Sequence, residues 1–592
     1  MITILDFYID EPACLGVPPY FSPYCRYVAG ALVDGGIPTE QITYLTVDQW
    51  RENGKELKDD PELVIIIAGS TVPGKYLGGK LGTVSEIMEF LDFRSKYQKN
   101  TVTLIGGPIR HASDGILQMI RNKKGIVIKG DIEVAAAKFA ENSNSIQHIA
   151  EKYFANQDQL TLAHLKRDTH QLDKWALDGS YLTALHPNFP YLMLEIETYR
   201  GCTRQKHCSF CSEVFYGKPV FRPSAGIIAE IKEQYQLGNR YFRLGRQADL
   251  YTYGSQLQSY TNGFPKPEPS EIERLYSGIR QIAPNLKVLH LDNVNPGGVV
   301  AFPQQSAEIT KIISKYNTAG DTAAMGLETV DPVVFEINKL KCQWDDALRA
   351  IEIINEYGGQ RDGGIPKLLP GLNFIHGLPG ESIQTFEKNY EFLKEVLKQN
   401  LLLRRINIRQ VTIHPKTKAE MLSTDPDIYK TYGISRKQRK PSLLQKKFVY
   451  YRDKIRKEID REMLKRVFPP GTILKEVIPE IQNPGFILGR QLGSYPVTVK
   501  VPLDDPTAVA SLQNKKPMDI IVTGYKERSL LGISYPIQIN RLGRTSLMQI
   551  PGIGSRRAGS VALQRPLNNL SELIEITENL PFGCDNDYLF ST

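Results

Sequence analysis

Three cysteines within ten residues of one another have the residue type and spacing that could do chemistry. Cys202, Cys208 and Cys211 follow an apolar run of strand length at 191–196 and precede a helix-like run at 225–237. Thiolates on a short loop at the end of a strand can converge on one iron–sulfur cluster. Three ligands leave one iron of a 4Fe-4S cluster open, and a substrate or cofactor can bind there. The triplet therefore predicts such a cluster.

Two other interpretations of the triplet stay open from the residues alone. A structural zinc site normally has a fourth Cys or His at a defined spacing. His207 could supply that ligand, although adjacent residues such as His207 and Cys208 seldom bind the same ion. The three thiols could also be buried and bind nothing.

The segment that must position these cysteines alternates between strands and helices from residue 191 to about 430. This pattern predicts a partial or full parallel β/α barrel, whose catalytic groups lie at the carboxyl ends of its strands. The expected strands are 191–196, 241–244, 287–291, 322–327, 369–375 and 406–412. Polar residues gather where these strands end: Arg246, Gln247, Asp249, Asp292, Asn293, Glu328, His376, Asn407, Arg409 and Gln410.

Residues 1–150 alternate in the same way, with apolar runs at 2–8, 63–68, 102–105 and 125–128. They predict an α/β domain with a doubly wound parallel sheet. Glycines after two of the strands would let a ligand approach the carboxyl edge closely, but ordinary turns explain them equally well. No dinucleotide-binding glycine pattern is present, so nicotinamide or flavin binding is not expected. The candidate binding residues are Gly69, Ser70, Gly106 and Gly107.

The remaining segments predict a linker and three appendages. Residues 151–190 are polar and mixed, which indicates a linker that packs on the next domain. Residues 431–467 form a basic segment, with thirteen Lys or Arg and four acids between 436 and 466 and aromatic residues among them. A helix of this kind suits contact with a phosphate backbone, and a solvated linker helix is the equal alternative.

Two smaller domains are expected after the basic segment. Residues 468–542 predict a small β-barrel with strands at 472–477, 495–501, 518–523 and 529–535. Residues 543–592 contain a helix, a Pro-Gly-Ile-Gly turn at 551–554 and a second helix. The backbone amides of such a turn can point at a phosphate oxygen.

Composition limits the class of protein. The 592 residues are long enough for about three to five domains, and 41% hydrophobic with 23% charged residues is ordinary for a globular protein. No run of eighteen apolar residues occurs, and the start lacks the pattern of a signal peptide. Seven cysteines, odd in number and partly clustered, favour a reducing cytoplasm over a disulfide framework. The expectation is a cytoplasmic protein with no membrane contact.

Several motifs resemble the radical S-adenosylmethionine (radical SAM) superfamily. They are Arg200-Gly201-Cys202 with Cys208-Ser209-Phe210-Cys211, and then the segments 221–223, 325–329 and 377–381 in that order. The subgroup that it resembles joins such a barrel to an N-terminal cobalamin-binding-type domain. Residues 489–495 and 525–532 are similar to the TRAM barrel of tRNA-modifying enzymes, and 550–554 to a helix-hairpin-helix motif. Together these are similar to archaeal radical SAM proteins with a C-terminal helix-hairpin-helix.

The chain departs from the family pattern at two places. Five residues separate Cys202 from Cys208, where the usual motif has three. The N-terminal domain lacks the Asp-x-His-x-x-Gly motif that supplies a lower cobalt ligand, so two alternatives stay open: cobalamin binds without that histidine, or it does not bind. Cys14 and Cys25 are too few for the extra cluster of a methylthiotransferase.

The resemblance also implies roles for single residues. The three cysteines would hold three irons of the 4Fe-4S cluster, and S-adenosylmethionine would chelate the fourth. Reduction by a donor such as ferredoxin or flavodoxin would cleave it to a 5′-deoxyadenosyl radical. Phe210 would flank the adenine or the cluster, or else be a core aromatic residue. Arg246, Gln247 and Glu328 would contact S-adenosylmethionine, with a structural salt bridge as the alternative, and Tyr199 and Arg409 are further catalytic candidates.

The function that these features favour is a cobalamin-dependent radical SAM methyltransferase acting on an unactivated carbon of a macromolecule. The basic segment and the C-terminal domains favour RNA, tRNA in particular, as that substrate. Three alternatives stay open: a protein-residue C-methyltransferase, such as those that modify glutamine in methyl-coenzyme M reductase; a methylthiotransferase-like tRNA-modifying enzyme; and a nucleic-acid-binding protein with a structural cluster.

Overall fold

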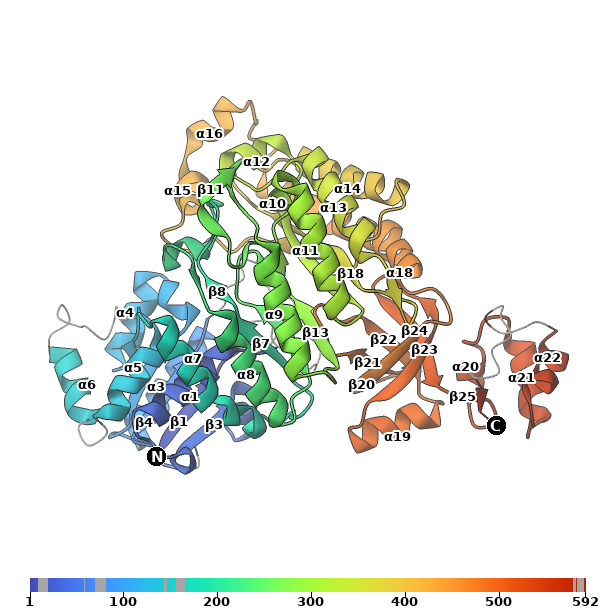
Figure 1. Ribbon diagram of the computed structural model, residues 1–592, viewed down its shortest axis with the longest axis horizontal. Coiled ribbons are helices and arrows are strands. Elements are labelled where there is room, and N and C mark those ends of the chain that lie inside the picture. Colours follow the sequence, from blue (N-terminus) through green and yellow to red (C-terminus); the bar gives the residue numbers. More distant parts are fainter. Residues whose placement is uncertain are drawn as a thin grey trace.

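The computed structural model is arranged as a row of regions that follow the chain (Figure 1). A blue N-terminal sheet lies beside a larger green and yellow α/β region. An orange β-barrel and a red group of helices follow at the C-terminal side. The structure describes residues 1–8, 20–57, 59–69, 81–142, 146–155, 166–578, 582 and 590–591.

The N-terminal region is a five-stranded parallel sheet in the order β3-β1-β4-β5-β6. Alternate residues of its strands face two separate hydrophobic cores, one shared with α1 and α5 and the other with α2, α3 and α4. This two-sided burial explains why the strands read as continuous apolar runs. The order is that of a doubly wound sheet whose direction reverses between β1 and β4, as predicted. The elements are β1 (Ile2–Asp6), α1 (Pro23–Asp34), β3 (Ile42–Thr46), α2 (Val47–Glu52), β4 (Leu63–Ile67), α3 (Val84–Tyr97), β5 (Val102–Gly106), α4 (Asp114–Asn122), β6 (Ile126–Val127) and α5 (Ile132–Glu141).

The N-terminal sheet and the next region are joined tightly. The short strand β2 (Tyr20–Phe21) leaves the first region and pairs in parallel with β7 (Met193–Glu197) of the second. Within the segment predicted as a linker, α7 (Thr169–Asp178) packs between α1 and α8 (Ser224–Gln236). The helix axes approach closely because Gly30 and Gly179 lack side chains: a Cβ on either would overlap a carbonyl oxygen of the opposite helix.

The central region is a parallel β/α barrel that is open on one side. Two four-stranded sheets, β13-β10-β7-β2 and β14-β15-β18-β19, follow one another around it. They are joined where β13 continues into β14 after one residue, and the Ala324 amide donates to the Asp292 carbonyl at 3.1 Å. Each predicted strand of this segment coincides with an observed one. These strands are β7, β10 (Tyr241–Gly245), β13 (Val288–Leu291), β15 (Asp321–Glu328), β18 (Leu368–His376) and β19 (Arg405–Gln410), and the short β14 (Asn293–Val294) was not predicted.

The basic segment forms one helical rod beside the barrel. It consists of α17 (Pro441–Ile455), a π-helical turn (Arg456–Asp460) and α18 (Arg461–Val467). The rod packs against α14 (Ile383–Lys398). Phe448 of the rod is buried and its ring lies against His376 of β18, whereas Tyr450 is 56% exposed.

The C-terminal region begins with a closed five-stranded barrel, in the order β20-β21-β22-β24-β23. Its strands are β20 (Ile473–Asn483), β21 (Phe486–Gln491), β22 (Thr498–Pro502), β23 (Met518–Tyr525) and β24 (Ser529–Tyr535). Three short helices follow at the far end of the molecule (Figure 1): α20 (Arg544–Leu547), α21 (Ser555–Leu563) and α22 (Leu570–Thr577). Across the described ranges, no helix is both long and apolar enough to cross a membrane.

Candidate active site

The three cysteines lie on a loop that is held at both ends. β7 leads into β8 (Tyr199–Arg200), and β8 pairs in an antiparallel manner with β9 (Val220–Phe221) beyond the loop. Gly201 turns the chain out of β8 with a φ of 88°, a conformation that glycine adopts without strain. The loop therefore starts at the carboxyl end of β7, where the sequence predicted it.

Cys202, Cys208 and Cys211 all line one cavity of about 220 Å³. Burial raises the pKa of the Cys202 thiol to about 11, and it raises that of Cys211 well above its usual value. In the described part of the chain, no three His, Cys, Asp or Glu side chains converge closely enough to hold a single metal ion. The three thiols thus line the same cavity but do not converge on a single metal ion.

The five-residue gap between the first two cysteines places Arg204 against the second. Arg204 Nη1 donates to the Cys208 sulfur at 3.1 Å, and Nη2 donates to the Leu340 carbonyl at 2.9 Å. The guanidinium also lies over the Phe264 ring at 5.2 Å. Arg204 is 9% exposed, so the longer loop brings a buried positive charge to a cysteine sulfur.

The opposite wall of the cavity is formed by polar residues of the central strands. Charges alternate along it: Arg243 Nη2 lies 3.2 Å from Glu195 Oε1, and Arg243 Nη1 lies 3.6 Å from Asp292. These side chains come from neighbouring strands because inward-pointing residues of parallel strands line up in layers. The wall contains Glu195, Arg243, Arg246, Gln247, Asp292, Asn293, Asn295, Glu328, Asn373 and Arg409.

Among the predicted residues, Glu328 has a buried carboxylate oxygen that accepts no hydrogen bond from the described residues. It sits at the end of β15 with a φ of 67°, and its side chain is buried. Lys341 Nζ lies 3.2 Å from Oε1, while Oε2 has no hydrogen-bond partner among the described residues. Burial raises the pKa of Glu328. Glu328 therefore offers a buried acceptor to whatever fills the cavity.

Three other predicted residues, Phe210, Arg246 and Gln247, also line the cavity. Phe210 is 3% exposed and adjoins the thiols. Arg246 Nη2 donates to the Tyr24 hydroxyl at 2.9 Å and so reaches the N-terminal region. The Gln247 side chain is already bonded, donating to the Leu244 carbonyl at 3.1 Å and accepting from Thr198 Oγ1 at 3.3 Å.

Tyr199 and the N-terminal glycines do not line the cavity. The Tyr199 hydroxyl is buried and donates to the Asp249 carbonyl at 2.7 Å. Gly69 and Gly107 take positive φ angles of 100° and 86° at the carboxyl edge of the N-terminal sheet, and Gly106 packs there against Ile132. Ser70 lies outside the described residues.

Tyr495 lines the cavity although nothing in the sequence pointed to it. It lies on the loop between β21 and β22, which enters the central barrel from the C-terminal barrel. The Ser494 amide donates to His290 Nδ1 at 2.9 Å, and Ser494 Oγ donates to the Leu291 carbonyl at 3.0 Å. Arg204, Glu213 and Lys341 are further lining residues that the sequence did not indicate.

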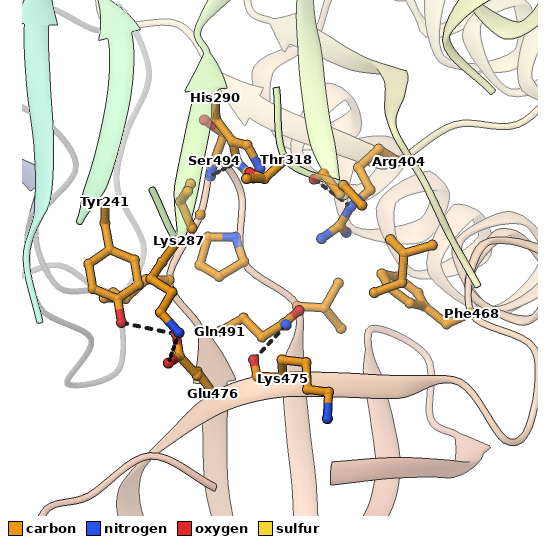
Figure 2. A pocket seen from close by; sticks show the side chains of 18 of the residues that line it. Tyr241, Lys287, His290, Thr318, Arg404, Phe468, Lys475, Glu476, Gln491 and Ser494 are labelled. Atoms are coloured by element: carbon orange, nitrogen blue, oxygen red, sulfur yellow. Dashed lines mark hydrogen bonds and ion pairs between the residues drawn. The ribbon is translucent and has the colours of Figure 1, made fainter. Parts of the chain in front are cut away.

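A second cavity, of about 340 Å³, lies on the other side of this loop (Figure 2). It is lined by the amino ends of the central strands and by β20 and β21. In Figure 2 the Arg404 side chain points into this cavity from one side. On the other side Lys287 lies next to Glu476, with 2.8 Å between the ammonium nitrogen and a carboxylate oxygen. Residues 492–494, 496 and 497 line this cavity, whereas Tyr495 lines the one with the cysteines, so the loop separates the two.

Comparisons with known proteins agree with the geometry of the central region. Residues 196–393 match the family model of the radical SAM superfamily. An uncharacterized protein of Methanocaldococcus jannaschii is 38% identical over 544 residues, which are 89% of this chain and 92% of that protein. An uncharacterized protein of Archaeoglobus fulgidus is 34% identical over 574 residues, 96% of each chain.

A solved structure of the radical S-adenosylmethionine methyltransferase TsrM from Kitasatospora setae, with cobalamin and a 4Fe-4S cluster bound, is also similar. Its TM-score is 0.47 at 13% identity, and the match covers 71% of this chain and 76% of that one.

Proposed function

Because the chain belongs to the radical SAM superfamily, we propose that Cys202, Cys208 and Cys211 hold a 4Fe-4S cluster. The observation that carries the proposal is that all three thiols line one cavity at the carboxyl ends of parallel strands. The fit is chemical as well as spatial, because cysteine thiolates are the usual ligands of iron–sulfur clusters.

The same cavity suits S-adenosylmethionine, which together with the cluster supplies the radical that starts the reaction. Glu328 Oε2 would accept a hydrogen bond from its ribose or amino group, since it has no hydrogen-bond partner among the described residues. Lys341 holds Glu328 in place, through its contacts at 2.9 Å to the Gly326 carbonyl and 3.2 Å to Glu328. Phe210 would cover an apolar face, and Arg409 closes the wall on the side of β19.

We further propose cobalamin as the methyl carrier, held by the N-terminal sheet. Its carboxyl edge adjoins the cysteine loop. His111 stacks on Phe215 with ring centroids 4.8 Å apart, and Arg200 Nη1 lies 2.7 Å from Asp131 Oδ1. Gly69 and Gly107 leave backbone without side chains at this edge. Cobalamin would bind here without a histidine ligand to its cobalt, since the chain lacks the Asp-x-His-x-x-Gly motif.

The substrate that we favour is RNA, with a protein side chain as the alternative. The helical rod of residues 441–467 and the closed C-terminal barrel support a large, negatively charged substrate. The electron would come from a small donor such as ferredoxin or flavodoxin.

A pair of cysteine variants tests the central part of this proposal. Anaerobically reconstituted protein should contain about four irons per chain, and Cys208→Ala should lose most of that iron and the visible absorption. Cys342→Ala is the matched control, because Cys342 is buried but does not line the cavity. Equal iron content in the two variants would refute the assignment.

Transfer of a labelled methyl group tests the proposed reaction and its substrate. S-adenosylmethionine carrying a labelled methyl group would be incubated with the reduced, cobalamin-loaded protein and either unfractionated tRNA or total cell protein. We expect label in the RNA fraction. Label in protein alone would replace RNA with the alternative substrate, and 5′-deoxyadenosine without labelled product would remove methyl transfer from the proposal.

A further inference from the structure

Four arginines from three elements lie near one another, and one of them, Arg409, lines the active-site cavity. We call them the arginine entrance: Arg405 and Arg409 of β19, Arg456 of the π-helical turn and Arg528 of the β23–β24 turn. We infer that the arginine entrance binds the phosphate backbone of an RNA strand and leads it to the cavity. This inference rests on the proposed function and names the contact that selects its substrate class.

The order of residues along β19 connects the entrance with the cavity. Arg405, Asn407 and Arg409 alternate on one face of the strand. Arg405 Nε donates to Asn407 Oδ1 at 2.7 Å, and the Arg405 guanidinium lies over the Tyr495 ring at 5.0 Å. Arg409 and Tyr495 both line the cavity. Arg405 therefore contacts a residue of the cavity wall, Tyr495, and Asn407 lies between Arg405 and Arg409 along the strand.

The outer half of the entrance lies at the surface. The side chains of Arg456 and Arg528 are 27% and 39% exposed. Arg528 also experiences the charges of the other three arginines: burial and these neighbours lower its pKa to about 10. The four guanidinium groups therefore act as one positive region that runs from solvent to the cavity.

Two of these arginines have a carboxylate nearby. Asp460 Oδ2 lies 3.6 Å from Arg528 Nε, and Asp453 Oδ1 lies 3.7 Å from Arg456 Nη1. Each guanidinium group has five N–H donors, so a single carboxylate leaves donors for a phosphate. Guanidinium groups match the fork of phosphate oxygens, and a group of four fits a repeating phosphate backbone better than one anion.

The adjoining helix is also basic. Lys446, Lys447 and Arg452 belong to α17, which continues directly into the π-helical turn that carries Arg456. Tyr450, which is 56% exposed, lies among them. Aromatic rings between cations are typical of single-stranded nucleic-acid binding, because bases stack on them. This neighbourhood favours RNA over a protein segment as the occupant.

Salt-dependent binding to the full-length protein tests the inference. The probe is a single-stranded RNA oligonucleotide, and affinity is measured over a series of salt concentrations. The double variant Arg456→Ala/Arg528→Ala should bind about tenfold weaker per arginine removed, and the slope of log affinity against log salt should fall by about 1.4. The control is Arg274→Ala/Arg349→Ala, whose side chains are 62% and 54% exposed on α9 (Pro269–Ile282) and α13 (Trp344–Gly358).

The lysine double variant Arg456→Lys/Arg528→Lys separates charge from folding. It should keep the salt slope of the wild-type protein, since both positive charges remain. Loss of the slope in the lysine variant, or an equal loss in the surface control, would overturn the inference, as would salt-insensitive binding by the wild-type protein. Iron content is measured on the same samples. If the protein holds the cluster but does not bind RNA, the arginine entrance is refuted and the proposed reaction is not. If it binds RNA but holds no cluster, the proposed reaction is refuted and the arginine entrance is not.

Discussion

Arg204 shows what the two additional residues between the first two cysteines accomplish. They allow a buried guanidinium to donate a hydrogen bond to the Cys208 sulfur at 3.1 Å. Hydrogen bonds and positive charge near cysteine sulfurs favour the reduced, more negative form of an iron–sulfur cluster. The proposed chemistry requires that form. Arg204 is therefore placed to raise the reduction potential of the cluster.

Replacing Arg204 by glutamine should lower that potential by tens of millivolts, given that about 59 mV corresponds to 1.4 kcal/mol for one electron. The measurement is a redox titration followed by electron paramagnetic resonance. Lys206→Gln is the control, because Lys206 lies on the same loop but is exposed. Identical potentials in the two variants, at equal iron content, would show that Arg204 only packs the loop.

Asp460 should make RNA binding depend on pH. Burial raises its pKa to about 7, against the opposing influence of Arg405, Arg456 and Arg528. Below that pH the carboxyl group is neutral and the arginine entrance keeps its full positive charge. Affinity should therefore fall a few-fold as the pH rises from about 6 to 8, and Asp460→Asn should remove this change. An unchanged pH profile in that variant would assign the titration to another group.

The sequence predicted part of the site because strand ends can be read from it. Cys202 and Glu328 come after strands that it located, Arg409 lies within one, and all three line the cavity. Tyr495 could not be found in this way. Its segment, Leu-Gly-Ser-Tyr-Pro, indicates a turn, but its position inside another barrel depends on the Ser494 contacts made in the folded chain.

At the scale of elements, the strands with continuous apolar runs were predicted and those with weaker patterns were not. β21 has the sequence Phe-Ile-Leu-Gly-Arg-Gln, in which glycine and two polar residues hide its alternation. β2 has only two residues and exists because β7 offers it an edge. α7 was taken as part of a polar linker, since its apolar face becomes evident only when α1 and α8 are placed beside it.

The contact between α1 and α7 depends on glycine. Gly30→Ala would force a Cβ against the Trp175 carbonyl and move the two helices apart. We expect a loss of about 1–3 kcal/mol in the free energy of unfolding, measured by denaturant titration. Gly115→Ala in α4 is the control, because a Cβ there meets nothing within 4 Å. It should be neutral or stabilising by about 0.5–1 kcal/mol. Equal stability of the two variants would contradict the close packing.

At the scale of the molecule, one hydrophobic core extends from the N-terminal sheet into the central barrel. It contains residues of β1 and β4 as well as of β10 and β18, with Trp175 among the largest fully buried side chains. The terminal helices belong to a separate core, which includes Ala558 and Val561 of α21. An N-terminal sheet that shares a core with the barrel keeps a fixed distance to the cysteine loop. Such a fixed distance suits methyl transfer between two cofactors.

Hydrogen exchange can test this division. Amides of β4 and β18 should open with the same free energy, because a shared core unfolds as one cooperative unit. Trp175→Ala should lower the protection of both strands by the same amount, about 3–5 kcal/mol. Protection of α21 should stay unchanged, since its core does not contain Trp175. If β4 lost protection while β18 kept it, the N-terminal sheet would be an independent unit, and its distance to the cysteine loop would have to be set by ligand binding instead of by the fold.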